Sequence, residues 1–172
     1  MSPFSAVNHF RMLGTYNRLA NERIFAPCAA LPDEEYRRER FGSFGSIHRT
    51  LNHILLADRI WMGRFTSAGV SSTPALGAIL YDDFASLRAA RAEEDSGIEA
   101  FLGGLTEEFL AGEIRYINSA GKNCSDPAAL VLQHMFNHAT HHRGQVHVMM
   151  SDAGLKPVSL DMHRAIRPNP SV

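Results

Sequence analysis

The chain has 172 residues, of which 45% are hydrophobic and 20% charged, and its 17 Lys and Arg against 18 Asp and Glu give a formal net charge of −1. This length and composition are typical of one globular domain, which we expect to span residues 1–172. The balanced charge argues against a nucleic-acid-binding surface, and no apolar run reaches the roughly 18 residues of a membrane span, so we expect neither nucleic acid nor membrane as a partner.

The first half of the chain contains two segments with apolar residues at helical spacing. The first predicted helix covers about 4–30 and ends before Pro32, which disfavours helical geometry in the residue that precedes it. A short polar turn is expected over 34–40. The second predicted helix begins after Ser46, a favourable N-cap, and continues to about Phe65. A loop rich in small residues then follows.

That loop is expected over 69–74, and the third predicted helix covers about 82–102. The pattern over 103–126 is less regular, and residues 115–123 are compatible with one arm of a small hairpin. The irregular stretch over 103–126 therefore separates the third predicted helix from the last one.

The fourth predicted helix opens with Ser125-Asp126-Pro127, a cap residue followed by proline in the first turn. It is expected to continue to about Asp152 and to end at Gly154. We expect the rest of the chain, about 156–172, to form an extended C-terminal tail. Four amphipathic helices with little strand signal predict an all-α fold, an antiparallel four-helix bundle with a short hairpin before the last helix.

Five of the nine histidines lie in the fourth predicted helix. At about 100° per residue, His138 and His142 fall on its apolar face one turn apart, close enough for both imidazoles to bind one metal ion. His134 and His138 form a rival pair with the same spacing but lie nearer the edge of that face. His141 and His147 are expected at the surface or facing a partner. We favour His138 and His142 as a pair of metal ligands.

His53 in the second predicted helix also projects from an apolar surface. Buried imidazoles are costly unless their ring nitrogens have partners, and one divalent ion satisfies a nitrogen of each. Three protein ligands leave a fourth position for water or substrate, as in catalytic zinc sites. The sequence thus predicts a metal site of His53, His138 and His142. A helical protein with buried, hydrogen-bonded histidines and no metal is the competing interpretation.

The histidine pair does not belong to a peptidase motif. Ala139 stands where zinc peptidases of the HExxH type carry their general-base glutamate. Asp58 and Gln145 are candidates to accept hydrogen bonds from the ligand histidines, because such rings usually donate their second N–H. Trp61 and Phe65 are one turn apart and are expected in the core, in a dimer interface or along a cleft.

The two cysteines, Cys28 and Cys124, are far apart and form no CxxC motif. The sequence begins without a basic segment followed by a long apolar stretch. We therefore expect a cytoplasmic protein with free, unreactive thiols.

Three stretches of the chain resemble the DinB family of the DinB/YfiT-like superfamily: YNRLAN at 16–21, LNHILLADRIW at 51–61 and HMFNHATHHRGQ at 134–145. The resemblance spans about residues 4–155. It implies a four-helix bundle with one divalent ion, usually zinc or nickel, held by the histidines at the positions of His53, His138 and His142. It also implies a homodimer. Related members of the superfamily are metal-dependent transferases or isomerases that use low-molecular-weight thiols.

From the residues and the resemblance together, we expect a metal-dependent enzyme of the thiol-transferase type that acts on a small molecule. The metal would lower the pKa of a thiol or of water and so produce a nucleophile. A metal-dependent hydrolase is one alternative, and a non-catalytic metal-binding or stress-associated module is another. The sequence contains no substrate-binding motif that names the substrate.

Overall fold

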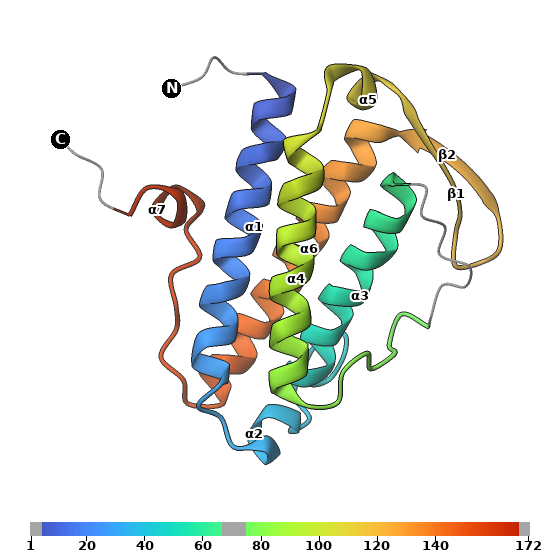
Figure 1. The fold of residues 1–172 in the computed structure, drawn as a ribbon. Coiled ribbons are helices and arrows are strands. Elements are labelled where there is room, and N and C mark those ends of the chain that lie inside the picture. The colour runs from blue at the N-terminus through green and yellow to red at the C-terminus, as the bar shows by residue number, and fades with distance from the viewer. Residues whose placement is uncertain (1–4, 67–74, 169–172) are drawn as a thin grey trace.

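The computed structural model describes residues 5–66 and 75–168. The structure is mostly helical, and four long helices lie side by side (Figure 1): α1 (Ala6–Cys28), α3 (Ile47–Phe65), α4 (Phe84–Gly103) and α6 (Ala128–Asp152). Helices α1 and α3 both contact α4 and α6, so each long helix has two long neighbours. Within the described ranges, no helix is both long enough and apolar enough to cross a bilayer.

Shorter elements surround the long helices: α2 (Asp33–Arg37), α5 (Glu107–Ala111), α7 (Met162–Ile166) and the strands β1 (Glu113–Ile117) and β2 (Asn123–Pro127). The two strands pair antiparallel, with Tyr116 opposite Cys124, and form the hairpin expected before the last helix. The hairpin lies beside α3 on the side of the molecule opposite α7 (Figure 1).

Side-chain caps explain where three of the long helices begin. Ser46 accepts a hydrogen bond from the backbone N–H of Arg49, as predicted, and Ser5 and Asp83 cap α1 and α4 in the same way. The positive φ of 78° at Gly154 follows the end of α6, also as predicted. The predicted loop over 69–74 and the predicted helix start at residue 4 lie outside the described residues.

The predicted start of the last helix was wrong. Ser125 and Asp126 do not cap α6, because they pair with Arg115 and Ile114 in the hairpin. Pro127 is the residue before the helix and offers no side-chain cap. A ladder of backbone hydrogen bonds therefore replaces the expected local cap.

The C-terminal tail differs from the expected extended segment because residues 162–166 form α7. Ala165 of this helix is buried in a small cluster with Tyr16 and Ala20 of α1. The Tyr16 hydroxyl also donates to the Leu160 carbonyl at 2.8 Å. These contacts attach the tail to the outer face of α1.

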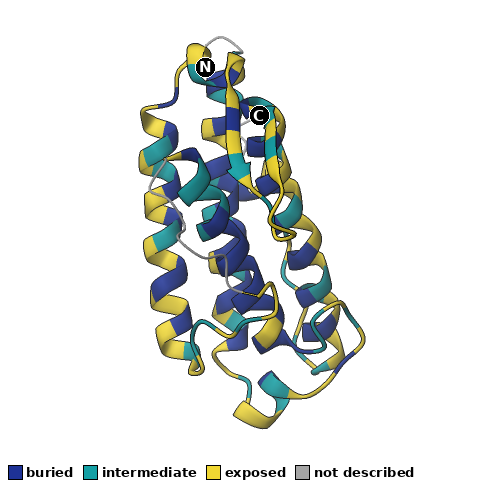
Figure 2. Ribbon diagram, turned by 90° about the vertical axis from the view of Figure 1, so that its right-hand side faces the viewer, coloured by how far each residue is buried: buried dark blue, intermediate teal, exposed yellow. Residues whose placement is uncertain are grey.

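Buried residues line the inward faces of the long helices (Figure 2) and form two large apolar clusters. One contains Phe10 and Leu13 near the start of α1, and the other contains Ile24 and Phe25 near its end. Between these positions along the helices lies a buried polar layer: Asn17, Asn21, Asp58, Arg91, Asp95 and Arg143.

The polar layer pairs its charges internally. Arg91 bonds Asp58 at 2.7 Å and Asp95 at 2.9 Å, and all three side chains are at most 3% exposed. Asn21 donates to Asp95 at 2.9 Å and accepts from Arg143 at 3.1 Å. Two arginines therefore balance two aspartates, and the amides supply further hydrogen bonds, as a buried charge requires.

Helices α1 and α4 approach closely at Gly14, and a substitution there tests the packing. A Cβ at Gly14 would overlap the Leu102 side chain, which is only 1% exposed. We expect Gly14→Ala to lower the free energy of unfolding by about 1–2 kcal/mol, because overpacking outweighs the gain in helix propensity.

The matched control is Gly97→Ala on α4. This glycine is exposed, and a Cβ there meets no atom within 4 Å. Alanine should therefore raise the free energy of unfolding by up to about 1 kcal/mol. Urea denaturation of both variants provides the measurement, and equal stability of the two would contradict the close approach at Gly14.

Candidate metal centre

Helices α3 and α6 bring three histidine side chains to one point. One ring nitrogen from each of His53, His138 and His142 lies within 4.8 Å of the others. The Nε2 atoms of His53 and His138 are 3.0 Å apart. The i, i+4 spacing places the two α6 rings on one face, and the packing of α3 against α6 adds His53. The structure thus assembles the three histidines selected from the sequence.

Hydrogen bonds fix the orientation of two of these rings. The Nδ1 atom of His53 lies 2.8 Å from the Leu76 carbonyl oxygen, which can only accept, so this nitrogen carries the proton. The Nδ1 atom of His142 lies 2.8 Å from Oε1 of Gln145 and donates to it. Both neutral rings therefore keep a lone pair on Nε2, the atom that faces the other histidines, and this is the form that binds a metal ion.

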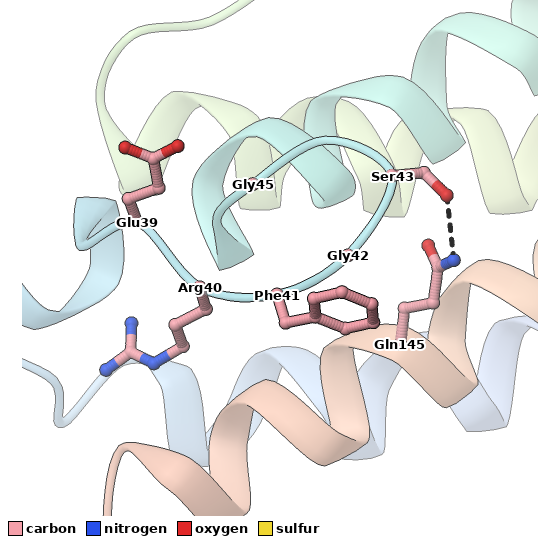
Figure 3. A pocket seen from close by; sticks show the side chains of 7 residues that line it. All are labelled: Glu39, Arg40, Phe41, Gly42, Ser43, Gly45 and Gln145. Atoms are coloured by element: carbon pink, nitrogen blue, oxygen red, sulfur yellow. Dashed lines mark hydrogen bonds between the residues drawn. The ribbon is translucent and has the colours of Figure 1, made fainter.

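Gln145 is itself held in place by the loop that precedes α3. Its Nε2 donates to the Ser43 hydroxyl at 2.9 Å (Figure 3). The same loop supplies Phe44, whose ring stacks on His53 with centroids 3.8 Å apart and meets His142 edge-on at 5.4 Å. The loop therefore covers one side of the histidine cluster. A surface hollow of about 740 Å³ lies on the outer side of Gln145, lined by residues 39–43, 45 and 145.

The environment of the cluster keeps its rings neutral. Burial, together with neighbouring His142 and His53, lowers the pKa of His138 to about 3. Burial also lowers the pKa of His53 and of His142. At neutral pH all three rings are therefore available as ligands without first losing a proton to solvent. His138 has a buried Nδ1 with no hydrogen-bond partner in the described part of the chain.

A cavity of about 320 Å³ adjoins the cluster. His53 and His138 line it, and its remaining lining residues are Ala57, Ile60, Trp61, Arg64, Leu76, Tyr116, Asn118, Ser119 and His134. This volume lies at the lower end of the range for small-molecule sites. Within the described residues, no Asp, Glu or Cys completes the cluster as a fourth ligand. The arrangement therefore offers three nitrogen ligands and access for a small molecule.

The other histidines of α6 lie outside the cluster. His134 is exposed and contributes only to the cavity wall, so the rival pair of His134 and His138 is not assembled. His141 is exposed, as expected. His147 is half-buried and bonds the Val158 carbonyl oxygen at 3.0 Å, so it contacts the tail of its own chain.

Of the two predicted partners of the ligand histidines, Gln145 is confirmed by its bond to His142. The prediction for Asp58 was wrong, because this residue pairs with Arg91 in the buried polar layer.

Two contacts of the cluster were not predicted from the sequence: the Leu76 carbonyl and the Phe44 ring. No sequence pattern identifies which backbone carbonyl will accept a hydrogen bond from a histidine. For Phe44, the sequence shows only that it lies in a glycine-rich loop. Phe65 is buried in the core, as predicted, and Trp61 packs against the same core cluster while it also lines the cavity.

The two cysteines, Cys28 and Cys124, are free, as expected, and the unreactive character predicted for them is supported at Cys28. Burial raises the pKa of the Cys28 thiol to about 12, so this thiol is protonated at neutral pH. Neither belongs to the histidine cluster.

Fold and site together define a mostly helical protein with a three-histidine cluster that could hold a metal ion. The model of the DinB family matches residues 6–170, and the chain belongs to this family. It is 28% identical over 155 residues to Protein DinB of Bacillus subtilis (strain 168), a match that covers 85% of this chain and 87% of that protein. The crystal structure of a DinB-like protein from Bacillus cereus ATCC 10987 shares the fold, with a TM-score of 0.60, 20% identity and coverage of 81% of this chain and 89% of that one.

Proposed function

We propose that the chain is an antiparallel four-helix bundle that binds one divalent metal ion, zinc or nickel, through His53, His138 and His142, and that it transfers a thiol to a small molecule. The observation that carries this proposal is the orientation of His53 and His142. Each donates its Nδ1–H to a fixed oxygen, so each presents an Nε2 lone pair toward the cluster. Rings that bind metal are held in this way.

The donor set favours activation of a nucleophile. When bound, the ion would supply a Lewis acid whose charge is not reduced by any anionic protein ligand, and it would lower the pKa of a thiol or of water. Leu76 and Gln145 hold two of the rings in position, and the Phe44 ring covers one side of the cluster. The cavity lined by His53 and His138 admits the reacting molecule.

Thiol transfer is favoured over hydrolysis by the composition of the cavity wall. No Asp or Glu is among the described residues that line it, so none of them places a carboxylate to act as a general base. A thiol has an ordinary pKa near 8.5 and needs far less help to ionise than water does. Because a metal ion held by three histidines can also ionise water, the preference for a thiol rests on this lower requirement together with the resemblance to superfamily members that use thiols. The homodimer and the cytoplasmic location stay predictions.

Turnover should require the metal ion. We expect protein loaded with zinc or nickel to consume a low-molecular-weight thiol, such as glutathione or cysteine, in the presence of a small electrophile. Chelator-treated protein and the His142→Ala variant should lose this activity, and metal added back should restore it only in the wild type. The measurement is the loss of free thiol across a panel of electrophiles.

His163→Ala is the control, because this histidine is exposed on α7 and outside the site. It should turn over thiol like the wild type. Metal-dependent cleavage of esters without thiol consumption would instead identify a hydrolase. A bound ion with neither activity would identify a non-catalytic module.

A further inference from the structure

The cavity beside His53 and His138 contains a cation with no carboxylate partner. Arg64 is half-buried in its wall and forms no ion pair in the described part of the chain. Arg59, on the same helix, pairs with Glu94 at 3.3 Å. The residues outside the described ranges include no Asp or Glu in the sequence. Arg64 thus brings an unbalanced positive charge to the cavity.

Two aromatic rings hold the guanidinium of Arg64. Its Cζ lies 4.5 Å from the ring centre of Trp61 and 4.3 Å from that of Tyr116. One N–H group contacts the Ile117 carbonyl oxygen at 3.3 Å, and the Tyr116 hydroxyl is anchored on Asp126 at 2.8 Å. An arginine has five N–H donors, so most of them are left for a ligand. The stacked, planar group is suited to bind a carboxylate through two parallel hydrogen bonds.

Among the described residues that line the cavity, Arg64 is the permanently charged one and none is acidic. Burial lowers the pKa of Arg64, which reflects the cost of keeping a cation there without an anion. A ligand that carries a negative group would remove this cost, whereas a neutral or cationic ligand would leave it in place. The volume fits a small molecule.

We propose that Arg64 binds the carboxylate of a small-molecule substrate and thereby selects acidic substrates for this cavity. Another part of the same molecule then lies near His53 and His138, which line the same cavity. This second statement depends on the metal-dependent function proposed above, but the binding of a carboxylate by Arg64 does not. Arg64 is accordingly a residue that positions the substrate and determines specificity.

The single tryptophan of the chain makes this proposal measurable, because Trp61 contacts Arg64 and lines the cavity. We would titrate the full-length, metal-free protein with 3-mercaptopropionate and with 3-mercapto-1-propanol, and follow tryptophan fluorescence. The two probes share the thiol and differ in the carboxylate. The wild type should bind 3-mercaptopropionate about tenfold more tightly, the effect expected of one charge-assisted pair. Arg64→Gln should bind both probes equally.

Arg49→Gln is the matched control, because Arg49 is an exposed arginine near the start of α3. It should keep the tenfold preference, and Arg64→Lys should keep part of it. Equal binding of both probes by the wild type would overturn the proposal. An unchanged preference in Arg64→Gln would overturn it as well.

A second measurement needs no substitution. Iodide should quench the fluorescence of Trp61 more strongly than caesium does, when each is normalised to free tryptophan amide, because Arg64 attracts anions to the ring. Equal normalised quenching would contradict an accessible cation there. Both experiments use metal-free protein, so failure of the metal site leaves them valid. Conversely, a protein that binds metal and turns over thiols without any carboxylate preference would overturn only the role of Arg64.

Discussion

Replacement of His138 by alanine should abolish tight binding of a divalent metal ion. We expect about one ion per chain in the wild type and only background in the variant, because a site of three protein ligands cannot hold the ion well with two neutral imidazoles. His138 contacts both other rings of the cluster, with ring centroids 4.9 Å from His53 and 4.4 Å from His142. Elemental analysis after loading with zinc or nickel measures the effect.

His134→Ala is the control for this experiment, because it removes a histidine from α6 without removing a proposed metal ligand. His134 lies one turn earlier on α6, is exposed and is not part of the cluster. This variant should retain about one ion per chain. If the wild type and both variants contain equally little metal, the three histidines are not a metal site, and they are then a set of buried rings within a helical protein.

The second large effect is expected in the buried polar layer. Arg91→Met should lower the free energy of unfolding by about 3–5 kcal/mol, because it leaves Asp58 and Asp95 buried without their cation. Those carboxylates are 1% and 3% exposed and cannot turn to solvent. For a chain of this size the melting temperature should fall on the order of 10 °C. Calorimetry or circular dichroism provides the measurement.

The control for this prediction is Arg18→Met on α1. Arg18 also pairs with two acidic side chains, Glu22 and Glu99, but its own side chain is 33% exposed. Solvent screens such pairs, so we expect a loss of no more than about 1 kcal/mol. A melting temperature for Arg91→Met that matches the one for Arg18→Met would mean that the buried aspartates are protonated rather than ion-paired.

The histidine cluster could be predicted because each part of it follows from local helical geometry. The pair on α6 depends on i, i+4 spacing, and His53 was found from its place beside Ile60 on an apolar surface. The cap at Ser46 is equally local, since it depends on residues three positions apart. Periodicity and capping depend on residues within one or two helical turns of each other, so both features can be read from a short stretch of sequence.

The partners of Asp58 and of His53 could not be predicted in the same way. Asp58 lies on the helix that carries His53, and nothing local shows that its partner is Arg91 on α4. The Leu76 carbonyl reaches His53 from a loop whose path is set by tertiary packing. The prediction of a helix cap at Ser125 was wrong for a related reason, because this residue pairs with Arg115 of β1 instead of starting a helix. Contacts between distant segments decide these details.

The cavity has walls of two different origins. The histidines in its wall, His53 and His138, belong to α3 and α6. Tyr116, Asn118 and Ser119 come from the hairpin between α5 and α6. The hairpin contacts the helices from outside and supplies none of the three histidines (Figure 1). A hairpin of altered sequence or length would change the wall of the cavity while the three histidines stay in place. The shape of the cavity and the histidine cluster therefore depend on separate parts of the sequence, and one can change without the other.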